Sequence, residues 1–198
     1  VLYPKREYAF RESFIVRTIP VEAFHHDEET LAYFMEDDVK RGKPSMPQMI
    51  VEGIVLPKPT PLSNRLKAKA QALLDAPPPC SADTLRHMRY WIGDCIWDLK
   101  EPRSRVEAIG TGTVLYGALA DFYLRANGFW ASGGKWIPRS LHKANPNYAA
   151  RFVDAFDRLF QDGAVHSVID LAEETLAPFG GFLFDGYRRD APHDWRIQ

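Results

Sequence analysis

An acidic residue inside an otherwise apolar strand pattern is the first candidate for chemistry. Glu22 lies between Val21 and Ala23, and Phe24 follows. Because moving a carboxylate out of water is expensive, an acidic side chain in a strand usually faces water, a cation or a metal ion. Two interpretations follow: Glu22 is a metal-binding or catalytic carboxylate, or it is an exposed residue on an edge strand.

Two aspartates and a tryptophan form the second candidate. Asp94 and Asp98 are four residues apart in a helical pattern, so both project from one side of the helix, and Trp91 precedes them on that side. Such a set suits a pocket for a cationic or hydroxyl-bearing small molecule, with one aspartate as the general base for an acceptor hydroxyl. The alternative is a solvated helix face paired with Arg86 or Arg89.

A glycine-containing segment with two cations is the third candidate. Gly133 and Gly134 allow the backbone to approach a ligand closely, and Lys135 and Arg139 offer two positive charges for phosphate oxygens. The glycine spacing is not that of a P-loop, and no strand pattern precedes it. The alternative is a loop between helices that is held down by Trp136 packed beneath it.

The elements that must position these candidates are of two kinds. Residues 10–16 and 21–26 read as two β-rich runs joined by a short turn. Two strands alone do not form a stable sheet, so we expect them to pair with strands that this sequence does not contain. Asp27 then caps the first helix and Ser45 caps a short turn. We expect helices over residues 29–38, 63–75, 82–99, 105–127, 147–161 and 164–176, a loop over 129–140 and an apolar tail over 178–187.

The sequence therefore predicts an α+β protein in two domains. Residues 1–76 form a short α/β part, and residues 81–190 form a mainly antiparallel helical bundle. The triple proline before Cys80 is a rigid break between them.

The composition is that of a globular protein of 198 residues, with 45% hydrophobic residues and a formal net charge of -1. This charge gives no sign of a nucleic-acid or membrane surface, and no apolar run approaches the roughly 20 residues that span a bilayer. Cys80 and Cys95 lie apart and follow no motif spacing. We therefore expect no disulfide framework and a cytoplasmic location.

Several segments together resemble a known family. SFIVRTIPVEAFHHDEETLAYF and RGKPSMPQMIVEG resemble the second half of the catalytic domain of small bacterial nucleotidyltransferases. RYWIGDCIWDL, ALADFYLRANGFWASGGKWIPRSL and LAPFGGFLFDGY are similar to the C-terminal helical domain of those proteins. The resemblance covers nearly the whole chain. It implies the polymerase-β-type nucleotidyltransferase fold, which aminoglycoside and lincosamide nucleotidyltransferases share, with the two N-terminal strands as part of its sheet.

The resemblance also implies a reaction, the magnesium-dependent transfer of a nucleoside monophosphate from a nucleotide triphosphate to a hydroxyl group of a small molecule. Glu22 matches the strand that carries an acidic residue of the metal site, so it is implied as a catalytic residue and a Mg²⁺ ligand. Asp94 is implied as a catalytic residue that faces the acceptor. The implied substrate contacts are Trp91, Asp98, Lys135 and Arg139.

The family's metal site also needs an Asp-x-Asp or Asp-x-Glu doublet after a Gly-Ser pair, and neither precedes Glu22. The chain begins with Val1 rather than methionine, and VLYPK resembles the stretch just after that doublet. We therefore expect an upstream segment of about 50–80 residues that carries it.

Two alternative functions stay open. One is a non-catalytic, nucleotidyltransferase-like module that binds a ligand or partner, and the other is a helical interaction protein over residues 81–187. The expected partners of the enzyme are a small-molecule acceptor and a nucleotide triphosphate, without nucleic acid or membrane, and a homodimer is possible.

Overall fold

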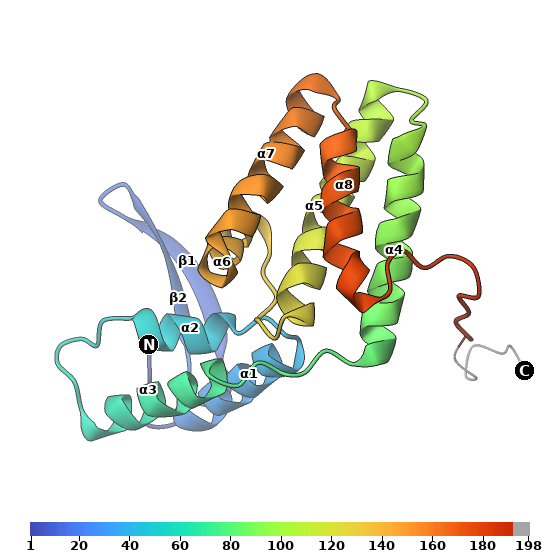
Figure 1. The fold of residues 1–198 in the computed structure, drawn as a ribbon. Helices are drawn as coiled ribbons and strands as arrows, with labels where there is room; N and C mark the ends of the chain where they lie inside the picture. The colour runs from blue at the N-terminus through green and yellow to red at the C-terminus, as the bar shows by residue number, and fades with distance from the viewer. Residues whose placement is uncertain (192–198) are drawn as a thin grey trace, which may run out of the picture. The chain divides into compact units, whose positions relative to one another are not determined.

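The computed structural model describes residues 1–191 and divides into two compact units, with the boundary between Pro78 and Pro79. The predicted α+β class is confirmed, because a two-stranded antiparallel sheet precedes a series of helices (Figure 1). Each unit has its own cluster of buried apolar residues.

The sheet of the first unit is a β-hairpin, as the sequence predicts. Strands β1 (Phe10–Val16) and β2 (Ile19–His25) pair antiparallel, and Val16 lies opposite Ile19. Arg17 and Thr18 form the two-residue turn with φ values of 46° and 73°. Such a turn needs positive φ at both residues because its twist must match that of the strands.

Over residues 1–191, the outer edge of β2 is paired only at its end. In a two-residue hairpin, Val16 and Ile19 form a hydrogen-bonded pair, so the pairing alternates and the backbone groups of Glu22 point away from β1. Farther along this edge, Leu2 forms a parallel bridge with His26, whose N–H donates to the carbonyl of Val1 at 3.0 Å. Leu2 thus forms a single isolated bridge beside β2.

Three helices complete the first unit, α1 (Glu28–Lys40), α2 (Ser45–Glu52) and α3 (Pro61–Leu74). Asp27 caps α1 as predicted: its Oδ1 accepts from the N–H of Thr30 at 2.8 Å. The expectation for Ser45 is wrong, because α2 is a full helix that begins at that residue after Pro44. The buried core of the unit is small and consists of Leu31, Met35, Leu66 and Ala70.

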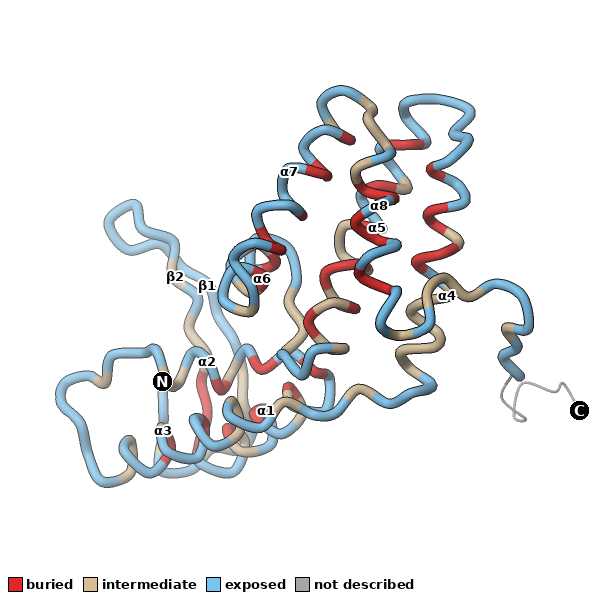
Figure 2. Tube along the Cα trace, in the orientation of Figure 1, coloured by how far each residue is buried: buried red, intermediate tan, exposed pale blue. Residues whose placement is uncertain are grey.

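The second unit is a helical bundle (Figure 1). The helices are α4 (Ala82–Lys100), α5 (Arg105–Ala126), α6 (Ile137–Ala144), α7 (Pro146–Asp162) and α8 (His166–Leu176), and two short 3-10 helices are η1 (Gly134–Trp136) and η2 (Ala177–Phe179). Buried positions follow the inward sides of α4, α5, α6, α7 and α8, which form one core (Figure 2).

Part of the predicted loop over residues 129–140 is wrong, because α6 begins inside it. Pro138 is tolerated in the first turn of α6, where its missing N–H is not needed. Ile137 and Leu141 lie one turn apart and are both buried, so an apolar side one turn long fixes this helix against the core.

A glycine sets the distance between two helices of the bundle. Gly112 on α5 is buried, and a Cβ atom added there would lie 2.6 Å from Cδ2 of Leu159 on α7. Gly112, in the segment AIGTGTV, therefore serves close packing between α5 and α7.

Candidate functional site

The side chain of Glu22 is 58% exposed on the middle of β2. Its Oε1 lies 3.6 Å from the guanidinium of Arg11 on β1, which is also largely exposed. Ser13 lies opposite Glu22 in the register, and the same face of the hairpin carries Arg11, Ser13 and Glu22. A shallow surface hollow runs along the hairpin and is lined by Ser13, Phe14, Ile15, Pro20, Val21 and Glu22.

The residues around Glu22 do not complete a magnesium site. Mg²⁺ prefers six oxygen ligands and is usually held by more than one carboxylate or by a carboxylate and phosphates. Over residues 1–191, no three His, Cys, Asp or Glu side chains gather closely enough to hold a metal ion. Glu22 therefore offers one carboxylate, and its nearest charged partner is a cation.

The two histidines after Glu22 lie in separate environments, so they do not share a ligand. His25 is stacked on Phe10 with ring centroids 4.2 Å apart, and its Nδ1 lies 3.0 Å from the hydroxyl of Tyr3. His26 is buried against Phe34, and burial lowers its pKa. Adjacent residues of a strand point to opposite faces, which accounts for this arrangement.

The exposed side of α4 carries the second candidate. Trp91 is 46% exposed, Asp94 is half-buried and Asp98 is exposed, whereas Ile92 is fully buried on the other side of the helix. The structure thus brings the three predicted residues to one side of α4. Trp97 is also exposed nearby, so aromatic surface flanks both carboxylates.

The pKa of the Cys95 thiol reflects the negative charge on this side of α4. Burial, together with the charges of Asp94 and Asp98, raises this pKa to about 11. A thiol with such a pKa stays protonated near neutral pH and is a poor nucleophile. Cys95 is therefore a packing residue.

The arginines proposed as alternative partners of the aspartates bind elsewhere. The guanidinium of Arg89 donates to the carbonyls of Gly180 and Gly181, both at 2.7 Å. Arg86 donates to the carbonyls of Gly186 and Arg188 at 3.0 and 3.4 Å. Both arginines hold the chain that follows η2, and within residues 1–191 neither forms an ion pair with Asp94 or Asp98.

The third candidate lies at η1 and the start of α6. Trp136 is 46% exposed, the guanidinium carbon of Arg139 lies 4.8 Å from its ring centroid, and Nζ of Lys135 lies 5.8 Å from it. Gly134 has a φ of +53°, a conformation that glycine adopts without strain. The two cations therefore gather around one tryptophan, which is exposed and does not pack beneath the loop.

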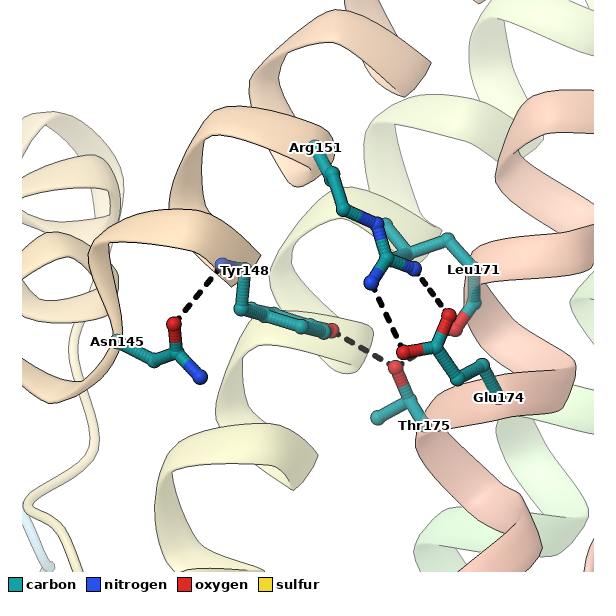
Figure 3. A network of polar contacts seen from close by, with 6 residues as sticks. All are labelled: Asn145, Tyr148, Arg151, Leu171, Glu174 and Thr175. Atoms are coloured by element: carbon teal, nitrogen blue, oxygen red, sulfur yellow. Dashed lines mark hydrogen bonds and ion pairs between the residues drawn. The ribbon is translucent and has the colours of Figure 1, made fainter.

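A polar network inside the bundle was not foreseen from the sequence (Figure 3). Tyr148 on α7 contacts Thr175 on α8 through their hydroxyl oxygens at 2.9 Å, and Thr175 donates to the carbonyl of Leu171 at 2.6 Å. On the surface beside them, Arg151 and Glu174 form a two-pronged ion pair. Burial raises the pKa of Tyr148. No sequence signal pairs residues 27 positions apart, and the network belongs to the core rather than to a site.

Comparison with protein-family models, with curated proteins and with solved structures found no match to this chain. Within residues 1–191, no helix combines the length and apolar character needed to cross a bilayer.

Proposed function

We propose that this chain takes part in the magnesium-dependent transfer of a nucleoside monophosphate from a nucleotide triphosphate to a hydroxyl group of a small molecule. The observation that supports it best is the position of Glu22, an exposed carboxylate on a strand whose outer edge is open beside it. The sequence resemblance assigns the same residue to the metal site.

The parallel pairing that Leu2 begins gives this proposal a geometric test. In a parallel ladder, each step back from Leu2 corresponds to one step back from His26 along β2. A strand that continued this pairing would lie beside Glu22 four residues before Leu2. The acidic doublet that the resemblance requires would have to lie on such a strand, close to Glu22.

The second unit would supply the acceptor side of the reaction. Asp94 would take the proton of the acceptor hydroxyl, and its half-buried position beside exposed Trp91 is compatible with a bound small molecule. Asp98 would hold the acceptor on the same side of α4. Lys135 and Arg139, gathered at Trp136, would contact phosphate or acceptor oxygens.

Nucleotide binding is the first test, made on the protein expressed from its own gene. A ligand that binds the native state at about 100 times its Kd adds roughly 2.7 kcal/mol to stability. For a chain of this size, this corresponds to a rise in Tm of roughly 5–10 °C. We expect such a rise with a nucleotide triphosphate and Mg²⁺ together, and a much smaller one with either alone.

Glu22→Gln should remove the magnesium-dependent part of this rise, because the amide no longer carries the charge that binds a cation. Glu29→Gln is the matched control, since Glu29 is an exposed carboxylate in the first turn of α1. If the wild-type protein shows no magnesium-dependent rise, or if Glu22→Gln retains it, the proposal is wrong.

Measurements of turnover distinguish the proposed roles of Asp94 and Asp98 on α4. A general base contributes roughly 100-fold or more, so Asp94→Asn should lower kcat by at least that factor. Asp98→Asn should mainly raise the KM of the acceptor. Lys135→Ala should weaken nucleotide affinity, measured as Kd by calorimetry. Unchanged kinetics in both aspartate variants would mean that Asp94 and Asp98 belong only to a solvated helix face.

A second candidate function is a non-catalytic module that binds a ligand or partner. The ion pair between Arg11 and Glu22 favours it, because a cation already neutralises the carboxylate that a metal would need. For such a module, we expect the ligand to raise Tm without Mg²⁺. We expect Glu22→Gln to leave this rise unchanged. The same measurements therefore distinguish the two functions.

A further inference from the structure

The chain after η2 is attached along α4, and we call residues 180–190 the strap. It follows α8 at the red end of the ribbon (Figure 1). Its backbone carbonyls accept hydrogen bonds from Arg89 and Arg86, as described above. At the start of the strap, Phe182 packs against the core of the bundle, close to Gly93 on α4.

Aromatic stacking attaches the second half of the strap. The ring of Tyr187 lies parallel to that of Tyr90 on α4, with centroids 4.0 Å apart, and the guanidinium carbon of Arg86 lies 5.2 Å from the Tyr187 centroid. Phe184 also stacks on Tyr90, although it is 63% exposed. This half therefore covers part of α4 through few contacts and little buried surface.

His87 on α4 is hydrogen-bonded to the strap through both ring nitrogens. Its Nδ1 lies 2.7 Å from the hydroxyl of Tyr187, and its Nε2 lies 3.1 Å from a guanidinium nitrogen of Arg189. A guanidinium only donates hydrogen bonds, so Nε2 must be the acceptor and carry no proton. The proton of neutral His87 is then on Nδ1, which donates to the Tyr187 hydroxyl.

A second proton on His87 is incompatible with this arrangement. It would occupy Nε2 and place two cations against each other, with Arg86 as a further positive charge over Tyr187. On the strap, the negative charge of Asp190 is bound to Arg188 at 2.8 Å. On α4, the acidic residue Asp83 lies one turn before His87, and the strap also carries Asp185.

We propose that His87 is a proton-operated latch that holds the strap against α4 when neutral and releases residues 184–190 when protonated. Release would uncover the ring of Tyr90, next to the side of α4 that carries Trp91, Asp94 and Asp98. Histidine is suited to this role because its charge ordinarily changes between pH 5 and 8. The latch does not depend on the proposed nucleotidyl transfer.

Hydrogen exchange of the strap tests the latch in the full chain. Exchange is followed by mass spectrometry at pH 8 and pH 5 and corrected for the intrinsic rate at each pH. Losing one to two hydrogen bonds corresponds to roughly a fivefold to thirtyfold loss of protection. We expect this loss over residues 184–190 at pH 5, while peptides from α5 keep their protection.

Three variants make the test specific. In His87→Gln, the side-chain amide can donate to Tyr187 and accept from Arg189 at any pH, so the strap should stay protected at both values. His87→Phe lacks both bonds and should leave the strap exchanging fast at both values. His142→Gln changes an exposed histidine on α6 and should behave as the wild-type protein.

The latch is refuted by either of two results. One is equal protection of residues 184–190 in the wild-type protein at pH 8 and pH 5. The other is a pH-dependent loss in His87→Gln as large as that of the wild-type protein. The latter would assign the pH effect to another group even if His87→Phe failed to fold.

Discussion

The buried hydroxyl pair between α7 and α8 leads to a prediction about stability. Which hydroxyl donates its hydrogen determines which of two substitutions destabilises the protein more. Thr175 has one hydroxyl hydrogen, and it is donated to the carbonyl of Leu171 at 2.6 Å (Figure 3). The hydroxyl of Tyr148 must therefore be the donor in the 2.9 Å contact with Thr175. Both residues are buried, so neither hydroxyl has water as a substitute partner.

Removing the hydroxyl of Thr175 and removing that of Tyr148 should lower the free energy of unfolding by unequal amounts. Thr175→Val keeps the side-chain shape but leaves the Tyr148 hydroxyl buried without an acceptor, which costs about 1–3 kcal/mol. Tyr148→Phe removes the donor, while Thr175 keeps its bond to Leu171, so we expect a loss of about 0.5–1.5 kcal/mol. The double variant leaves no unpaired hydroxyl and should be less destabilised than the sum of the two.

Urea unfolding monitored by far-UV circular dichroism measures these free energies. With an m-value of roughly 2 kcal/mol/M, Thr175→Val should lower the midpoint by about 0.5–1.5 M, and Tyr148→Phe by about half as much. The coupling energy from the double-mutant cycle should reach at least about 0.5 kcal/mol. If Tyr148→Phe is the more damaging variant, or if the two changes add, the assignment of donors is wrong.

Two further predictions concern packing and pH. Gly110→Ala should stabilise α5 by up to about 1 kcal/mol, because a Cβ there meets no atom within 4 Å. Gly112→Ala should destabilise the protein by about 1–3 kcal/mol, because its Cβ presses on Leu159. Equal urea midpoints for the two variants would contradict this. The lowered pKa of His26 means that its contribution to the first unit is complete above pH 6.5 and is lost as pH falls below that value. His26→Gln should flatten the dependence of Tm on pH between 7 and 5, and an unchanged slope would reject this cause.

The helices and the hairpin could be predicted because their signals are local. Asp27 and Ser81 accept from backbone N–H groups of the first turn in the way that capping residues do, and apolar spacing fixed the buried side of α4. The helix α6 was missed because it is only eight residues long and follows two glycines. With one short apolar side, it resembles a loop in sequence.

The candidate residues could be found from their types, but not their partners. That Trp91, Asp94 and Asp98 share one side of α4 follows from helix periodicity alone. Nothing in the sequence indicates that Arg86 and Arg89 would bind backbone carbonyls of the strap instead of carboxylates. Every residue has a backbone carbonyl, so the pattern of side chains does not show which carbonyl will accept a hydrogen bond.

The two separate cores have a consequence for any measurement of folding. The buried core of the first unit has four apolar residues, whereas the cluster of the second unit runs through all five of its α-helices. Small domains bury a smaller share of their surface and are correspondingly marginal. Calorimetry should therefore resolve two heat-absorption peaks instead of one, and the lower-temperature peak should belong to the part of the chain that carries the hairpin.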